Sequence, residues 1–240
     1  MGGSMLKLGI MQPYFFPYIG YFSLINYCDR FIYFDTPQYI HHGWVNRNRI
    51  LKQGNDATYI TVPTKKAARD TPINKIIINN ALAWKEKIYG QLSYYKRKAP
   101  YYYTAIEVVK SVLDNADENL SQLCIKSIEQ TCEFLGINTP CDIFSDMDLD
   151  IEEVTAPDEW ALNITKRLGY KTYVNPPGGI SFFDVKKYHI ANIEIEFLKH
   201  ELTPYIQRIG HFEPGLSIVD IMMFCSVEEI KEMLGKYQIL

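Results

Sequence analysis

Apolar and polar positions alternate in short blocks along the first part of the chain. Residues 6–11 are apolar and end at Gln12-Pro13, which predicts a buried strand, and from Tyr18 onward the apolar residues recur at helical spacing. Residues 30–35, rich in aromatic and β-branched side chains, predict a second strand. A strand, a helix and a strand in about 30 residues form a βαβ unit, which implies a parallel sheet.

The middle of the chain changes to a helical period. Apolar residues at i, i+3 and i+4 predict helices over residues 84–98, 102–113 and 120–135, with Pro100 between the first two. The further strands are expected at 58–63, 73–79, 141–145, 171–174 and 193–198, and the further helices at 157–169, 217–224 and 227–237. We therefore expect one α/β domain over residues 5–240, with a parallel, Rossmann-like sheet and a helical insert over about residues 82–136. Residues 1–4, before a second methionine, are interpreted as a cloning remnant.

Composition narrows the classes of function. A net charge of −3 argues against a dedicated nucleic-acid binder, although Lys65, Lys66 and Arg69 and the run 96–98 are local basic groups that we interpret as solvated faces. The 18 tyrosines fit either a sugar- or nucleotide-binding cleft or a simple compositional bias. No signal peptide or membrane-spanning run is visible, so we expect a cytoplasmic protein without a membrane partner.

The sequence offers no metal or thiol chemistry. Five cysteines are scattered without the paired spacing of a zinc site, and we expect no metal and no cofactor. The neighbouring His41 and His42 would point to opposite faces of an extended chain, so they cannot easily converge on one ion. Catalysis, if it occurs, should therefore use neither zinc nor a covalent cysteine intermediate.

The strongest local pattern is QPYFFPYIGY at residues 12–21, where the first strand meets the first helix. Open α/β sheets bind ligands at the carboxyl ends of their strands, because a helix amino terminus offers unpaired N–H groups there. Two prolines and a glycine fix this backbone, as a ligand loop requires. We predict that Gln12 and Tyr14 bind substrate; the alternative is a packed turn without a ligand.

A polar segment follows the second strand. Asp35 closes that strand, and it could act as a base, as could His41 or His42, whose ordinary pKa lies near neutral pH. The candidate substrate-binding residues here are Gln38, Trp44, Asn46, Arg47 and Asn48, which offer amides, a bidentate cation and a stacking face. The alternative is a solvated surface loop, on which the histidines have no catalytic role.

The chain resembles the bacterial WbqC-like protein family in five segments, which are GIMQPYFFPYIGYF, YFDTPQYIHHGWVNRNRI, TYVNPPGGISFFD, IEIEFL and YIQRIGHFEPGLSIVDIMMF. The resemblance runs from about residue 6 to residue 236. That family's first motif commonly begins His-Gln-Pro, and Met11 stands in the histidine's place here. The matched polar positions include Tyr205 and Gln207, which join the substrate-binding candidates on this ground.

The resemblance implies a setting in O-antigen and other surface-polysaccharide biosynthesis. It implies a transferase that adds an acyl or aminoacyl group, such as glycyl, to the amine of a nucleotide-linked amino sugar. The partners would then be that sugar nucleotide and an acyl or aminoacyl donor, with direct attack by the sugar amine. The alternative is a non-catalytic protein of the same pathway that only binds the sugar nucleotide. The sequence leaves the oligomeric state open.

Overall fold

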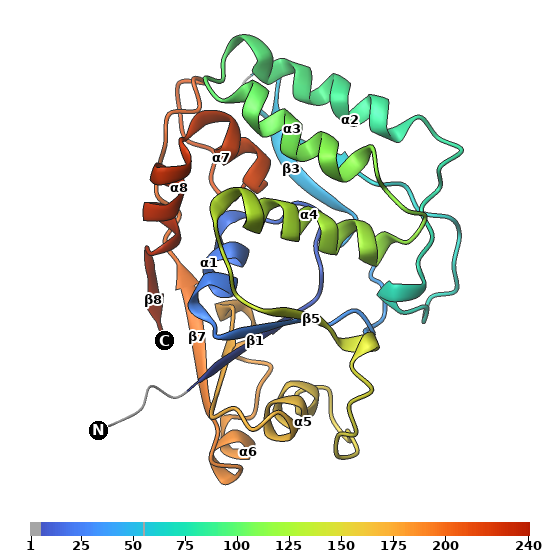
Figure 1. The fold of residues 1–240 in the computed structure, drawn as a ribbon, viewed down its shortest axis with the longest axis vertical. Coiled ribbons are helices and arrows are strands. Elements are labelled where there is room, and N and C mark those ends of the chain that lie inside the picture. Colours follow the sequence, from blue (N-terminus) through green and yellow to red (C-terminus); the bar gives the residue numbers. More distant parts are fainter. Residues whose placement is uncertain (1–5, 55) are drawn as a thin grey trace.

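The chain folds around a six-stranded sheet in the order β5-β2-β1-β6-β7-β8 (Figure 1). The computed structural model describes residues 6–54 and 56–240, so the remnant predicted at residues 1–4 lies outside the described residues. The strands are β1 (Lys7–Met11), β2 (Arg30–Tyr33), β5 (Cys141–Ile143), β6 (Thr172–Asn175), β7 (Glu194–His200) and β8 (Tyr237–Ile239). Every pairing is parallel except that of β7 with β8, which confirms the predicted parallel sheet.

The predicted βαβ opening is confirmed. β1 leads into α1 (Ile19–Tyr27), which begins two residues after Pro17, and the chain returns as β2 beside β1. The register places Gly9 opposite Phe31, and a β-carbon at Gly9 would lie 2.8 Å from the Phe31 ring and 2.9 Å from the Cys28 sulfur. Only a glycine therefore permits this close packing between the first strand and its neighbours.

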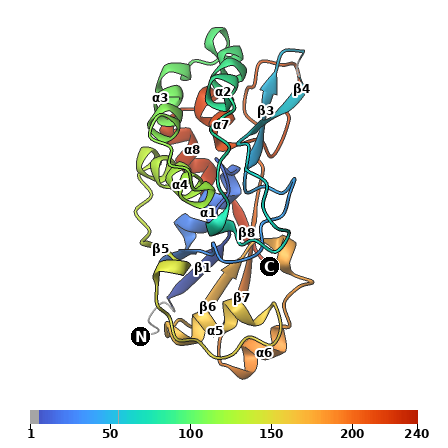
Figure 2. The same ribbon diagram turned by 90° about the vertical axis from the view of Figure 1, so that its right-hand side faces the viewer.

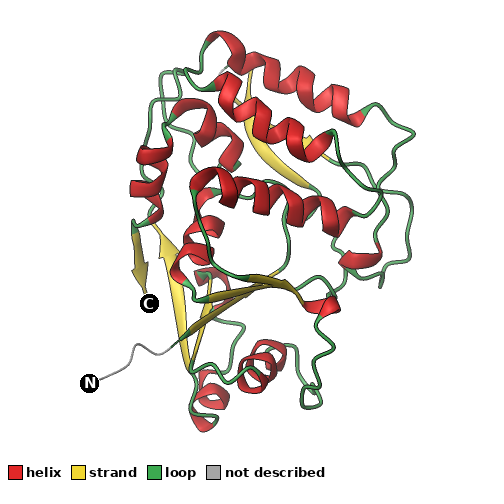
Figure 3. Cartoon of the chain, viewed as in Figure 1, coloured by secondary structure: helices red, strands yellow, loops and turns green. Residues whose placement is uncertain are grey.

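The helical insert is also confirmed, and it forms one end of the molecule (Figures 1 and 3). It comprises α2 (Trp84–Leu92), the 3₁₀ segment η2 (Ser93–Arg97), α3 (Tyr102–Leu113) and α4 (Leu120–Leu135). Asn119 caps α4 by accepting a hydrogen bond from the Gln122 amide, and Gly136 ends it in the left-handed conformation at φ +67°.

The sheet separates two cores, each covered by helices (Figure 2). Leu8, Ile10 and Ile32 point to the face covered by α5 (Glu159–Arg167) and α6 (Val185–Ile190). Phe31 and Tyr33 point to the other face, where the larger core includes α1, the insert, α7 (Ile218–Phe224) and α8 (Val227–Leu234). Successive residues of a strand face opposite sides, so one short strand contributes to both cores.

The structure contains two elements that the sequence did not predict, α6 (Val185–Ile190) and the C-terminal strand β8 (Tyr237–Ile239). Two further segments differ from the sequence-based expectation. Residues 47–49, expected in a loop, begin β3 (Arg47–Lys52), which forms an antiparallel hairpin with β4 (Asp56–Thr61). The strand expected at 73–79 is instead the 3₁₀ segment η1 (Ile73–Lys75) followed by isolated bridges from Ile77 and Ile78. The polar residues of β3 concealed the strand in the sequence, because the buried Asn48 finds its hydrogen-bond partner in a distant loop. The apolar run 76–78 looked like a strand, but in the fold it forms only isolated bridges.

A buried carboxylate joins the insert to the C-terminal part of the chain. Asp220 is completely buried, and its oxygens accept hydrogen bonds from the hydroxyls of Tyr95 and Tyr205 and, at 3.1 Å, from the Gln207 amide. The Tyr95 hydroxyl in turn accepts from the Leu51 amide of β3 at 2.7 Å. Burial raises the pKa of Asp220, which these three donors oppose. The network thus links β3, η2, α7 and the segment before it.

We expect Asp220→Ala to lower the free energy of unfolding by about 3–5 kcal/mol, because it leaves the buried hydroxyls of Tyr95 and Tyr205 without their acceptor. Chemical denaturation followed by circular dichroism measures the change. Asp148→Ala, at an exposed carboxylate, serves as the control and should change stability by less than about 0.5 kcal/mol. Equal stability of the two variants would contradict a structural role for the network.

Candidate functional site

A cavity of about 400 Å³ opens at the carboxyl edge of the sheet, between β1 and β6. From β1 the chain proceeds to β2 and then β5 on one side, whereas β6 and β7 lie on the other side of β1. The connections after β1 and β6 therefore run in opposite directions. The helix after β1, α1, covers one face of the sheet, and the helix after β6, α6, covers the other. Open α/β sheets bind their ligands at such a switch point, where the loops diverge and leave a crevice. The position alone makes this cavity the candidate site.

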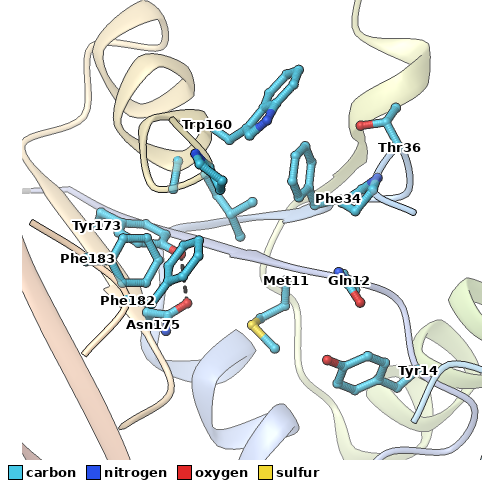
Figure 4. A pocket seen from close by; sticks show the side chains of 14 residues that line it. Met11, Gln12, Tyr14, Phe34, Thr36, Trp160, Tyr173, Asn175, Phe182 and Phe183 are labelled. Atoms are coloured by element: carbon cyan, nitrogen blue, oxygen red, sulfur yellow. Dashed lines mark hydrogen bonds between the residues drawn. The ribbon is translucent and has the colours of Figure 1, made fainter. Parts of the chain in front are cut away.

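Aromatic side chains form most of the cavity wall (Figure 4). Phe34 lies 5.5 Å from Trp160 between ring centroids, and on the opposite side Phe183 lies 5.6 Å from Tyr173 and 4.9 Å from Phe182. These rings come from the ends of β2 and β6, from α5 and from the loop before α6. Aromatic faces bind nucleobases by stacking and also accept the apolar faces of sugars.

The polar groups of the cavity are few and uncharged. Gln12 and Tyr14 lie on the β1 side and Asn175 on the β6 side, and Figure 4 shows all three at the hollow. The Asn175 amide oxygen accepts from the Tyr173 hydroxyl at 2.8 Å, and its nitrogen donates to the Pro176 carbonyl, so this side chain is fixed. Burial raises the pKa of Tyr14 and of Tyr173, which keeps both phenols neutral. The cavity therefore suits a ligand portion that is neutral and planar or ring-shaped.

The glycine pair after β6 shapes the cavity by close packing. A β-carbon at Gly179 would lie 2.3 Å from the Asn175 amide nitrogen and 2.8 Å from the Phe183 ring. The turn Pro177–Gly179 (η4) thus brings the backbone directly against two residues of the wall. The glycine is required there for the placement of Asn175 and Phe183.

The loop that carries Gln12 and Tyr14 into the cavity is held by a buried polar clamp. Phe16 is fully buried and has φ +40°, a left-handed conformation that costs a bulky residue free energy. Its carbonyl accepts from the Asn48 amide at 2.9 Å and from the Ser217 hydroxyl at 2.8 Å, and its N–H donates to the Ser127 hydroxyl at 3.0 Å. Three distant segments, in β3, before α7 and in α4, therefore fix one residue of the loop.

A further hydrogen bond fixes the backbone at the start of this loop. The Tyr21 hydroxyl of α1 donates to the Gln12 carbonyl at 2.9 Å, so the backbone of Gln12 is fixed while its side chain reaches the hollow. The residues predicted as substrate binders in the first motif, Gln12 and Tyr14, thus both line the cavity.

Asp35 is placed beside the cavity and not in its lining. Its neighbours Phe34 and Thr36 line the hollow, but Asp35 is 1% exposed. Its two oxygens accept from Ser145, at 3.1 Å from the amide and 2.7 Å from the hydroxyl. The carboxylate thus ties the end of β2 to the segment after β5, and its assignment as a base stays a prediction.

The other candidates of the polar segment lie outside the cavity lining. His41, His42 and Trp44 are exposed, and the Gln38 amide donates to the Arg69 carbonyl at 2.7 Å. The remaining three have partners within the protein. Asn46 donates to the Val62 carbonyl, Asn48 belongs to the clamp on Phe16, and Arg47 donates to the carbonyls of His42 and Gly43 and lies 4.4 Å from the Tyr59 ring centroid.

Tyr205 and Gln207 likewise have structural partners. Both belong to the Asp220 network, and Gln207 is 1% exposed and also bonds the Glu213 backbone through its amide oxygen and nitrogen. Burial and these partners leave Gln207 no free group for a ligand. The structure does not bring Tyr205 and Gln207 to the cavity with Gln12 and Tyr14.

The sequence reasoning missed most of the cavity wall. Trp160, Tyr173, Asn175 and Phe183 come from the last half of the chain, and their place depends on β6 pairing with β1. One local pattern could have indicated this part of the wall. The Pro-Pro-Gly-Gly turn at 176–179 stands directly after β6, and Phe182 and Phe183 follow it. A turn at the carboxyl end of a parallel strand is a common place for ligand contacts.

The described residues contain no group of three or more histidine, cysteine or acidic side chains that could hold a metal ion. Burial raises the pKa of the Cys141 thiol to about 11 and of the Cys225 thiol to about 12. These thiols are protonated at neutral pH and are poor nucleophiles.

Within the described part of the chain, no helix is both long and apolar enough to cross a membrane.

The clamp gives a testable consequence. We expect Asn48→Ala to lower the free energy of unfolding by about 2 kcal/mol, because the Phe16 carbonyl loses a buried donor while the strained conformation persists. The matched control is Asn138→Ala, an exposed asparagine whose amide bonds one carbonyl at 3.3 Å. Denaturant titrations of both variants decide, and a loss no larger than that of the control would refute the clamp.

Comparison with known proteins places the chain in context. The model of the WbqC-like protein family matches residues 12–232, a range that includes Gln12, Trp160 and Asn175. An uncharacterized protein of Mycobacterium tuberculosis is 28% identical over 226 residues, covering 93% of this chain and 96% of the relative. No solved structure gives a significant match to this chain.

Proposed function

Because this chain belongs to the WbqC-like protein family, we propose that it is a transferase that acylates the amine of a nucleotide-linked amino sugar. The proposal places the sugar nucleotide in the cavity at the switch point between β1 and β6. The group transferred is an acyl or aminoacyl group, such as glycyl, and the setting is the synthesis of bacterial surface polysaccharide.

The observation that carries the proposal is the uncharged, aromatic character of the cavity. No residue of its lining carries a charge at neutral pH, and its walls are aromatic rings from four separate segments. A nucleobase or a sugar ring is neutral and presents flat faces, whereas a diphosphate would need cations that this lining lacks. The base or sugar ring would therefore occupy the cavity, and the phosphates would extend toward solvent.

The transfer needs no protein nucleophile. The sugar amine would attack the carbonyl carbon of an activated acyl donor, a C–N bond would form, and the leaving group would depart with its electron pair. The amine proton would pass to a base and then to the leaving group. Holding both reactants at the cavity mouth would supply much of the rate, and Asp35 or the loop histidines are the candidate bases.

One observation favours a second candidate function, the binding of a sugar nucleotide without catalysis. The cavity lining contains no aspartate, glutamate or histidine, and the nearest carboxylate in sequence, Asp35, already accepts two hydrogen bonds from Ser145. A pure binding protein requires only the stacking walls and the amides. Both functions predict binding, and only the first predicts a new covalent product.

We expect Trp160→Ala to weaken the binding of a UDP- or dTDP-linked amino sugar by about fivefold or more, because stacking of one base is worth roughly 1–3 kcal/mol. Isothermal titration calorimetry measures the affinity. Trp44→Ala is the matched control, since Trp44 is 48% exposed and lies outside the lining. If the control loses as much affinity as Trp160→Ala, or if neither loses any, the ligand does not occupy this cavity.

The choice between the two functions requires a product assay. We expect mass spectrometry to detect an acylated sugar nucleotide when the protein is mixed with an amino-sugar nucleotide and acyl or aminoacyl donors. Asp35→Asn should slow the reaction at least about a hundredfold if this carboxylate is the base, whereas the double change His41→Ala and His42→Ala should do so if an imidazole is. Binding without product for every donor would establish the non-catalytic alternative.

A further inference from the structure

A basic and tyrosine-rich corner lies at the end of the molecule opposite the cavity. Residues 94–103 read YYKRKAPYYY, and they form η2 and the turn into α3. In both views this turn projects at the end of the long axis, whereas α5 and α6, which flank the cavity side of the sheet, lie at the other end (Figures 1 and 2).

A hollow of about 420 Å³ separates this corner from the β3–β4 hairpin. Lys96, Arg97 and Lys98 line it together with Ser93 and Tyr94, and its lining contains no carboxylate. A neighbouring hollow shares Ser93 and Tyr94 and adds Lys52 from β3, whose charge is paired with Asp56 at 3.2 Å. Positive side chains around an open hollow create a local potential that attracts anions, although the whole chain has a net charge of −3.

The basic side chains of the corner are available to a partner. The ion pairs between described residues include none of Lys96, Arg97 and Lys98. Lys98 is held in place by Tyr94, to whose hydroxyl it donates at 2.7 Å and whose ring centroid lies 4.4 Å away. Lys96 and Arg97 are exposed to solvent.

Exposed tyrosines border the same corner. Tyr101 and Tyr103 are 38% and 67% exposed, and both are within a few residues of the basic run. Tyrosine is enriched where proteins meet the interface of a bilayer, because its ring is apolar and its hydroxyl is polar. Lysine, arginine and exposed tyrosine on one projecting turn therefore match the two chemical features of a membrane surface, anionic headgroups and a half-apolar interface.

We propose that this corner attaches the protein to the surface of an anionic lipid bilayer. The hollow receives a lipid phosphate between Lys96 and Arg97, and Tyr101 and Tyr103 enter the headgroup region. A flat bilayer can contact only a projecting part of a protein, and this turn is such a part. A free phosphate would use the hollow but not the tyrosines, and a nucleic-acid backbone would need more cations than the corner supplies.

The attachment is peripheral and leaves the cavity accessible. The sequence predicted no membrane partner because that prediction considered only apolar spans, whereas attachment by charge and tyrosine needs no span. With the corner against lipid, the opposite end of the molecule faces the aqueous phase. The inference goes beyond the proposed function and does not depend on it.

Vesicle co-sedimentation tests the proposal. The full chain should bind vesicles of phosphatidylcholine and phosphatidylglycerol but not vesicles of phosphatidylcholine alone, and added salt should weaken the binding. One basic residue near an anionic surface contributes about fivefold, so Lys96→Glu with Arg97→Glu should weaken partitioning about thirtyfold or more. Tyr103→Ala should weaken it by a smaller factor and leave the salt dependence unchanged.

The matched control is Lys65→Glu with Lys66→Glu, which makes the same change of net charge at two exposed lysines elsewhere. It should alter partitioning by less than about threefold, because charges away from the contact are screened. An equal loss in the control, or equal binding to neutral vesicles, would overturn the proposal. So would binding of inorganic phosphate or a single-stranded oligonucleotide at the corner without any binding to vesicles. Thermal melts verify that each variant is folded.

Discussion

The conformation of Phe16 is the constraint on which the candidate site depends. A buried phenylalanine at positive φ is unfavourable by itself, and it persists only because Asn48, Ser127 and Ser217 saturate its backbone N–H and carbonyl. The turn that results directs residues 12–14 from the end of β1 toward the cavity. Strained backbone of this kind is often found beside functional sites, and it persists only where surrounding contacts hold the residue in that conformation.

The same clamp explains why distant polar residues are buried together. Asn48 lies in β3 of the hairpin, Ser217 precedes α7, and the Pro17 carbonyl accepts from the Ile218 amide at 2.9 Å. The Asp220 network lies one helical turn further along and holds the insert against the same hairpin. An unpaired buried polar group costs more than an exposed one, so these contacts specify a single arrangement of the N-terminal loop, the hairpin and the C-terminal helices.

The two ends of the molecule differ in their chemistry. The cavity end is aromatic and neutral, and it lies where the strand order reverses. The insert end carries the basic corner beside exposed tyrosines. In our proposals the first binds a sugar nucleotide and the second a bilayer surface, which would place a soluble substrate and an anionic membrane at opposite ends of one protein.

The sequence alone determined the local elements and the fold class. The apolar block before Gln12, the helical spacing after Pro17 and the aromatic strand before Asp35 were sufficient for the βαβ unit, and the three-helix insert followed from a sustained helical period. These features depend on residues close in sequence. Gln12 and Tyr14 could be predicted together for the same reason, since the end of β1 and the start of α1 are neighbours in the chain, and both residues line the cavity.

Tertiary structure decided which polar residues face the cavity. Asn48, Gln207 and Asp35 appear in the sequence only as hydrogen-bonding side chains, but each is buried against a partner that folding brings to it. Asn48 bonds the Phe16 carbonyl 32 residues away and Asp35 bonds Ser145 110 residues away. Gln207 bonds Glu213 and Asp220, which lie 6 and 13 residues further along the chain. Trp160 and Asn175 join the site only because β6 pairs with β1 and not with β5. Periodicity reports which face of an element is apolar, and it contains no information about strand order, which depends on long-range packing.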